Sequence, residues 1–165
     1  MSAEAEFRLI EKSWLDELLD HAKIKTEKKL FRKKGPDRYK SFLNSHSKKL
    51  KDGTQTGSDL THALEFLAKK KGVNLLSGKY DSIAHTIGEE RQASTFILTY
   101  EHRQNYVDKL NVANFTKEEL VAFNKTFSED DDPELANAEI ECIRTLKDNL
   151  EALPDDNHVI VVSIG

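Results

Sequence analysis

The sequence predicts an α+β protein that is predominantly helical, with five or six helices around a small sheet of about three strands. Two observations support this prediction. Apolar residues recur at helical spacing through most of the chain, whereas residues 82–100 and 158–164 are rich in β-branched and aromatic residues. The length of 165 residues and the 38% hydrophobic content are typical of one domain, so we expect a single domain over the whole chain. A weak division into a basic helical lobe, 1–52, and a mixed lobe, 58–165, is the alternative.

The first part of the chain is expected to be helical. Residues 3–22 are predicted to form an amphipathic helix because apolar residues recur every three or four positions: Phe7, Ile10, Trp14, Leu18 and Ala22. A lysine-rich helical stretch follows and ends at Gly35-Pro36. Asp37 then begins another helix, whose apolar face extends to Leu50.

The middle of the chain changes from helical to strand-like periodicity. Ser58 is expected to cap a helix that ends at Gly72, with lysines in its last turn, where positive charge is favourable. Residues 82–87 and 94–100 then predict a β-hairpin, because both are rich in β-branched and aromatic residues and the polar segment 88–92 separates them.

The last third of the chain has clear helix signals and a terminal strand. The segment from Thr116 to Glu119 has the pattern of a capping box, which predicts a helix that begins there. Asp132-Pro133 predicts the start of a last, long helix. The nearly continuous β-branched run at residues 158–164 predicts a strand that is buried on both faces.

Charge is separated along the sequence. Residues 23–51 hold twelve basic and two acidic side chains, a net charge of +10, while the whole chain carries −4. Residues 128–157 hold eleven acidic side chains against two basic ones. Separation of this kind points to a charged partner.

The basic segment is the predicted binding surface. Lysine outnumbers arginine there by ten to two, which favours contact with phosphates or carboxylates over recognition of specific bases. We therefore expect nucleic acid or an acidic protein as the partner. The predicted binding residues are Lys28, Lys29, Arg32, Lys33, Lys34, Arg38, Lys40, Lys48, Lys49 and Lys51.

Three further residues form a catalytic alternative. In the predicted hairpin Asp81 begins one strand and Glu101 follows the other, so their carboxylates are placed to hold Mg²⁺ with Arg103 beside them. This arrangement resembles the core of restriction-type nucleases, in which a helix precedes a hairpin bearing Asp and Glu-x-Lys. Arginine stands here in place of that lysine and the third strand of the core is not visible, so the chain is not assigned to that class.

No cofactor and no resident metal are expected. The histidines are scattered, and one helical turn at His62 offers only Asp59 as a second ligand, whereas a zinc site needs at least three. The single cysteine, Cys142, excludes an internal disulfide and is expected to be a buried, inert thiol. No apolar run is long enough to cross a membrane and the first residues do not look like a signal peptide, so we expect a cytoplasmic protein without membrane contact.

These observations favour a small cytoplasmic binding protein over an enzyme, with the basic segment engaging nucleic acid or an acidic protein. The first alternative is an inhibitor or immunity-type protein that binds a basic partner through its acidic C-terminal half. The second alternative is an Mg²⁺-dependent nuclease. The opposite charges of the two halves also allow a homo-oligomer.

Overall fold

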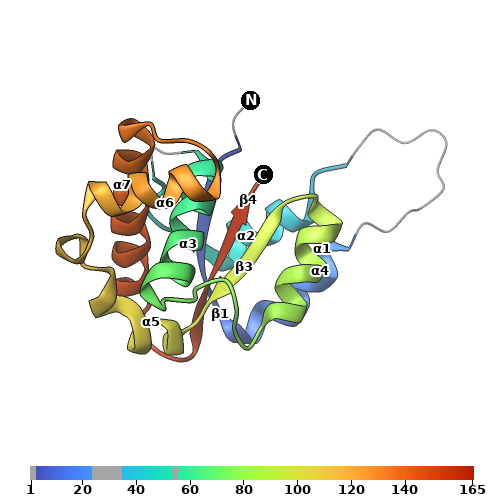
Figure 1. Ribbon diagram of the computed structural model, residues 1–165. Coiled ribbons are helices and arrows are strands. Elements are labelled where there is room, and N and C mark those ends of the chain that lie inside the picture. The colour runs from blue at the N-terminus through green and yellow to red at the C-terminus, as the bar shows by residue number, and fades with distance from the viewer. Residues whose placement is uncertain (1–2, 24–34, 54–55) are drawn as a thin grey trace.

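The computed structural model describes residues 3–23, 35–53 and 56–165, and its centre is a four-stranded antiparallel sheet (Figure 1). The strands lie side by side in the order β2-β1-β4-β3, and their bounds are β1 Ala5–Glu11, β2 Ser47–Lys49, β3 Ser94–Leu98 and β4 His158–Ile164. The first and last strands of the chain are therefore neighbours in the middle of the sheet.

Helices cover both faces of this sheet (Figure 1). One face carries α1 Leu15–Ala22, α2 Arg38–His46 and α4 Asp81–Arg91. The other face carries α3 Gly57–Lys71, α6 Lys117–Phe127 and α7 Pro133–Glu151. The connections contain the short α5 Tyr100–Tyr106 and the 3₁₀ turns η1 Lys12–Trp14, η2 Val107–Leu110 and η3 Val112–Asn114. The described residues thus form seven α-helices and four strands, against the five or six helices and about three strands predicted.

The sheet separates two apolar cores because its central strands bury side chains on both faces. Along β4, Ile160 and Val162 belong to the core under α3, α6 and α7, whereas Val159 and Val161 belong to the core under α1, α2 and α4. This confirms the predicted strand at residues 158–164 and explains its β-branched composition, since the four consecutive positions 159–162 are buried in one core or the other.

The predicted helix over residues 3–22 is wrong in its first half, where the chain forms β1. Phe7 and Leu9 contact one core and Ile10 contacts the other, an alternation with a period of two. Phe7 and Ile10 are also three positions apart, so the same residues fit a helical pattern. Pairing with both β2 and β4 satisfies the backbone of this segment as a strand. The α-helical part begins only at Leu15.

The predicted hairpin near residues 82–100 is also wrong, because residues 82–87 lie in α4. Ala84 and Ile87 are buried there, and they face the sheet as part of a helical stripe. Of the hairpin only β3 remains, and it pairs with the distant β4. The helix expected to run from Asp37 towards Leu50 is also shorter, since residues 47–49 form the edge strand β2. Tertiary contacts override local propensity at each of these places.

The helices predicted to begin near Ser58, Thr116 and Asp132 are confirmed as α3, α6 and α7, but the expected cap of α3 is wrong. Thr56 and not Ser58 caps this helix, because the Thr56 hydroxyl accepts from the backbone N of Asp59. Thr116 and Glu119 form the reciprocal capping box at α6, and the side chain of Asp132 caps α7 by accepting from the backbone N of Glu134 at 2.9 Å. In the parts of the chain described here, none of the helices has the length and apolar character needed to cross a membrane.

Candidate functional site

The C-terminal end of α3 presents three consecutive lysines. At the start of this helix Thr56 Oγ1 accepts from the backbone N of Asp59 at 3.2 Å, and Asp59 Oδ2 accepts from the backbone N of Thr56 at 2.9 Å. Gly72 ends the helix in the left-handed conformation, with φ of 64°. The lysines at positions 69–71 therefore lie in the last turn, where the helix dipole favours positive charge.

One face of α6 is turned towards these lysines. Thr116 Oγ1 accepts from the backbone N of Glu119 at 3.2 Å, and Glu119 Oε2 accepts from the backbone N of Thr116 at 3.0 Å. This capping box fixes where the helix begins, and residues three or four positions apart then share a face. The residues on that face are Glu119, Ala122, Phe123, Thr126 and Phe127.

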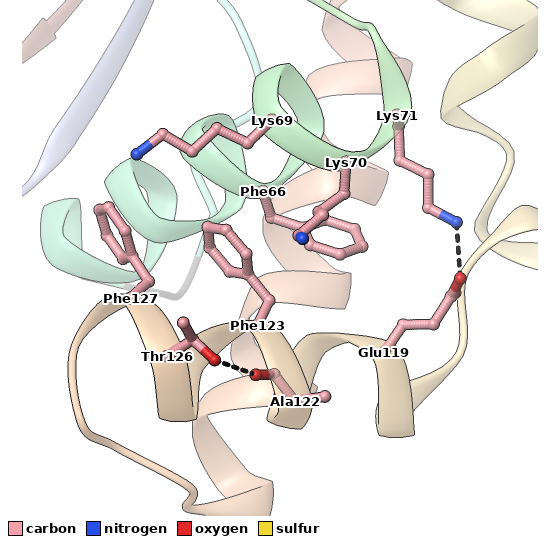
Figure 2. Close-up of a pocket in the computed structure, with 9 residues that line it drawn as sticks. All are labelled: Phe66, Lys69, Lys70, Lys71, Glu119, Ala122, Phe123, Thr126 and Phe127. Carbon is pink, nitrogen blue, oxygen red and sulfur yellow. Dashed lines mark hydrogen bonds and ion pairs between the residues drawn. The ribbon is translucent and has the colours of Figure 1, made fainter.

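α3 and α6 enclose a groove of about 570 Å³ (Figure 2). Its apolar wall is a row of three rings. Phe66 and Phe123 meet edge to face with centroids 5.5 Å apart, and Phe123 and Phe127 stack with centroids 5.1 Å apart and an interplanar angle of 14°. The lysines of α3 line the other side. The volume lies within the range, roughly 300–1,000 Å³, that ligand sites occupy.

Phe127 is the exposed end of this aromatic row. It is 40% exposed, whereas Phe66 and Phe123 are buried. The ammonium nitrogen of Lys69 lies 4.5 Å from the centre of the Phe127 ring. A large exposed aromatic side chain that continues a buried cluster is typical of surfaces that a partner completes.

The three lysines differ in their ion pairs. Lys71 Nζ lies 2.9 Å from Glu119 Oε1, so this pair bridges α3 and α6 (Figure 2). Lys69 Nζ lies 3.2 Å from Glu65 Oε2 within α3. Lys70 is exposed and forms no ion pair with any residue of the described chain. The hydrogen bond from Lys71, with help from the backbone N of Thr116, lowers the pKa of Glu119, so its charge is retained as the pH falls.

The predicted basic surface lies only partly within the described residues. Five of its members lie outside them: Lys28, Lys29, Arg32, Lys33 and Lys34. The other five are exposed and come from α2, β2 and the residues just after β2: Arg38, Lys40, Lys48, Lys49 and Lys51. Of these five residues, Lys40 and Lys49 line one hollow, which Glu6 of β1 also lines.

Two of these five cations already have acidic partners. Lys49 Nζ lies 2.6 Å from Asp52 Oδ2, and Lys51 Nζ lies 2.6 Å from Asp148 Oδ2. None of the five lines the groove between α3 and α6, and α2 packs on the opposite face of the sheet (Figure 1).

The predicted catalytic residues do not form the hairpin arrangement that was expected of them. Asp81 is the first residue of α4, and its carboxylate accepts from the backbone N of Gly78 at 2.7 Å. Glu101 is exposed in the first turn of α5, and Arg103 donates to the carbonyl of Leu153. Across the described residues no three side chains of the His, Cys, Asp and Glu types gather closely enough to hold a metal ion.

The buried His102 has a structural role in a cavity of about 160 Å³ at the start of α5. The backbone N of Thr99 donates to its Nδ1 at 2.9 Å, so Nδ1 is the unprotonated nitrogen. Its Nε2 lies 2.9 Å from the carbonyl oxygen of Ser77 and donates to it. Both ring nitrogens therefore have partners within the fold.

Sequence reasoning missed the groove although part of its signal was present. Glu119, Phe123 and Phe127 recur every four residues along a helix that the sequence predicts. The partner helix lies almost fifty residues earlier, as the Lys71–Glu119 separation of 48 positions shows. The lysines of α3 were attributed to helix termination alone. Only the packing of α3 against α6 places them beside the rings.

The groove combines aromatic rings with charged side chains. Its nine lining residues in the described chain include aromatic rings, ammonium groups and one carboxylate, but no histidine, cysteine or serine. The hydroxyl of Thr126 donates to the carbonyl of Ala122 at 3.3 Å and is thereby engaged. Comparison with known proteins finds no matching family model, no matching curated protein and no matching solved structure.

Proposed function

We propose that this chain is a binding protein whose groove between α3 and α6 takes an acidic segment of a partner protein that carries an apolar side chain. The observation that supports this most is Phe127, which is 40% exposed while stacked on the buried Phe123 and covered by the ammonium group of Lys69. Aromatic side chains of this kind often provide most of the affinity of an interface.

The lysine rim favours an acidic occupant. Lys70 has no ion-pair partner in the described chain, so a carboxylate of the partner gains this contact without displacing another. Exposed ion pairs each contribute only about 0–1 kcal/mol, so the lysines are expected to set orientation and association rate. Burial of the apolar side chain against Phe127 supplies the larger share of the affinity.

The acidic loop after α6 disfavours nucleic acid in the groove. Residues 129–132 are four consecutive acids, and they follow Phe127 after a single serine. A phosphate backbone that continues along α6 meets this negative charge, whereas a short acidic segment ends before it.

The spacing along α6 suits a helical segment. Positions 119, 123 and 127 repeat at every fourth residue, which corresponds to a groove about 12 Å long at 1.5 Å per residue. Helices that dock into grooves place their apolar anchors at the same spacing. We therefore expect an amphipathic helix with acidic residues flanking one or two large apolar ones.

The proposal is tested by fluorescence anisotropy with a labelled amphipathic peptide of this composition. Phe127→Ser and Lys70→Glu are both expected to weaken binding, the first at any salt concentration and the second mainly at low salt. A peptide in which serine replaces the apolar residues is expected to lose most of the affinity.

The chain offers matched controls for both substitutions. Leu76 is 39% exposed, close to the value for Phe127, so Leu76→Ser removes a similar apolar surface outside the groove. Lys125→Glu reverses a charge on α6 that does not line the groove. If these controls weaken binding as much as Phe127→Ser and Lys70→Glu, the groove is not the binding site and the proposal is wrong.

A second candidate function is the binding of nucleic acid by the basic surface on α2 and β2. Arg38, Lys40 and Lys48 are exposed and have no ion-pair partner within the described residues. Reversal of Lys29, Lys33 and Lys48 to glutamate is then expected to weaken binding of labelled DNA or RNA in a salt-dependent way. Unchanged affinity contradicts this candidate.

A further inference from the structure

Two buried polar side chains join α6 to α7 next to the groove. Asn124 on α6 and Glu139 on α7 are both 0% exposed, and Asn124 Nδ2 donates to Glu139 Oε2 at 2.8 Å. The remaining two oxygens, Asn124 Oδ1 and Glu139 Oε1, have no hydrogen-bond partner in the described chain. Buried acceptors without a donor destabilise a fold, so this pair requires an explanation.

A proton on Glu139 satisfies both oxygens at once. A neutral carboxylic acid carries one O–H donor, and donation from Oε1 to Asn124 Oδ1 closes a ring of two hydrogen bonds between the side chains. An ionised carboxylate has no donor. It leaves two buried oxygens, one of them charged, without any partner.

The surroundings of Glu139 also favour its neutral form. Burial raises its pKa from 4.5 to about 7, and the hydrogen bond from Asn124 opposes this only in part. The charged groups that face Glu139 come from two neighbouring segments. His62 of α3 lowers its pKa, whereas Asp59 of α3 and Asp130 of the loop after α6 raise it. Glu139 therefore changes charge near neutral pH.

The same pair holds the end of α6 that carries Phe127. The backbone oxygen of Asn124 accepts from Ser128 N at 2.8 Å and from Ser128 Oγ at 3.1 Å, which closes the last turn of the helix. His62 meets the Phe127 ring edge to face, with centroids 5.6 Å apart and an angle of 90°. Asn124 is next to Phe123 in the sequence. Asn124 and His62, which both act on Glu139, therefore also adjoin the aromatic wall of the groove.

We propose that Glu139 makes the groove dependent on pH. When Glu139 carries a proton, Asn124 holds the end of α6 against α7 and the aromatic wall is in place. Ionisation breaks the hydrogen-bonded ring, loosens this end of α6 and weakens binding in the groove. The proposal rests on the proposed function, because it concerns regulation of the same site.

The direction of the effect follows from which form binds the proton. The form in which Asn124 holds α6 against α7 binds the proton of Glu139 more tightly than the loosened form does. The affinity of the groove is therefore highest below neutral pH and falls as the pH rises through about 7. The peptide's carboxylates stay ionised in this range, since the ordinary pKa of a carboxyl group is about 4.

The first test measures the dissociation constant of the acidic, apolar peptide at about pH 6 and at about pH 8.5. These two values lie on either side of the neutral pH at which Glu139 is expected to change charge. The dissociation constant of the unmodified protein is expected to rise at least about fivefold, the lower end of measured couplings between sites. Glu139→Gln keeps both hydrogen bonds of the ring at every pH, because its amide donates where the protonated acid did. Its affinity is therefore expected to stay high and constant.

Two further variants separate Glu139 from other groups. Glu141→Gln changes a carboxylate on the same helix that pairs with Arg144 on the surface, and it is expected to keep the full pH dependence. His62→Gln removes the imidazole beside Phe127, and the pH dependence is expected to persist in this variant as well. Loss of the pH dependence in His62→Gln assigns it to the imidazole and overturns the proposal.

The second test needs no ligand and therefore distinguishes this proposal from the proposed function. The ring resonances of Phe123 and Phe127 are followed by NMR as the pH is raised. They are expected to report one transition near neutral pH in the unmodified protein and none in Glu139→Gln. The same transition in both proteins, or in neither, overturns the inference. A further outcome is that the transition is specific to Glu139 but no peptide binds at any pH. In that case the proposed function is wrong, whereas the pH-dependent contact between α6 and α7 is supported.

Discussion

Lys71 and Glu119 form an ion pair that bridges α3 and α6, with 2.9 Å between Nζ and Oε1. The other carboxylate oxygen of Glu119 accepts from the backbone N of Thr116 at 3.0 Å. One side chain therefore caps α6 and also ties it to the helix that completes the groove. Phe123 and Phe127 follow Glu119 on the same face of α6, so this link lies in line with the aromatic wall of the groove.

Glu119→Ala is expected to lower the urea midpoint of unfolding, because it removes both the cap and the bridge to α3. The pKa of Glu119 is lowered in the folded state, so its contribution is present above the ordinary carboxyl value and is lost as the pH falls through the lower, folded-state value. The difference between variant and unmodified protein is thus expected to shrink in acid. Glu118→Ala, a change of a neighbouring exposed residue outside the capping box, is the control. Equal effects of the two substitutions contradict the role assigned to Glu119.

The stability of the protein is expected to fall as the pH rises from the ordinary glutamate value to above neutrality. Glu139 has a raised folded-state pKa of about 7, so its protonated form stabilises the fold fully below 4.5 and this contribution is lost by the time the pH exceeds 7. The loss corresponds to roughly 3 kcal/mol. Urea unfolding at a series of pH values measures it, and the curve of Glu139→Gln is expected to be flatter over the same interval. A curve of Glu139→Gln as steep as that of the unmodified protein contradicts this assignment.

Gly78→Ala is expected to destabilise the protein by about 1–3 kcal/mol through overpacking. A Cβ at this position lies 2.8 Å from Cε1 of His102, and the ring cannot move freely because Thr99 and Ser77 hold its two nitrogens. Gly35→Ala is the matched control, since no atom of residues 3–23, 35–53 or 56–165 lies within 4 Å of the added carbon there. Thermal unfolding of the two variants measures the difference, and equal melting temperatures contradict it.

Phe7→Ala is expected to cost about 3–5 kcal/mol and Ile10→Ala about 2–5 kcal/mol, because each leaves a cavity in a different core. Phe7 is 1% exposed in the core under α3, α6 and α7, and Ile10 is 1% exposed in the core under α1, α2 and α4. The two losses are expected to add, since the sheet separates the sites. Denaturant unfolding of the single and double variants tests this, and strong coupling between them contradicts the separation.

Signals within a few residues of each other correctly placed the starts of α6 and α7. Thr116 and Glu119 are three positions apart, and Asp132 directly precedes the proline that opens α7, so their hydrogen bonds form in any context in which the helix forms. The run at residues 158–164 needed only its β-branched composition, because its consecutive positions 159–162 are buried alternately in two cores.

The same local reasoning failed where one pattern fits two structures. Phe7 and Ile10 satisfy a helical stripe and also the two faces of a strand, and the choice was made by pairing with β4, more than 140 residues later. Residues 82–87 have the composition of a strand, but packing of α1 and β3 against them stabilises a helix. Both decisions depend on partners outside any local window.

The sequence by itself determined the α+β class, the capped helices, the buried terminal strand and the separation of charge, because composition and near-neighbour hydrogen bonds control these features. Only the tertiary structure decided where the groove and the buried polar pair lie. The groove requires Lys71 and Glu119, 48 positions apart, to face each other, and the buried pair requires Asn124 and Glu139 to meet between two helices. Contacts of this kind arise when helices pack to bury apolar surface, and that packing brings together polar groups that the sequence alone does not relate.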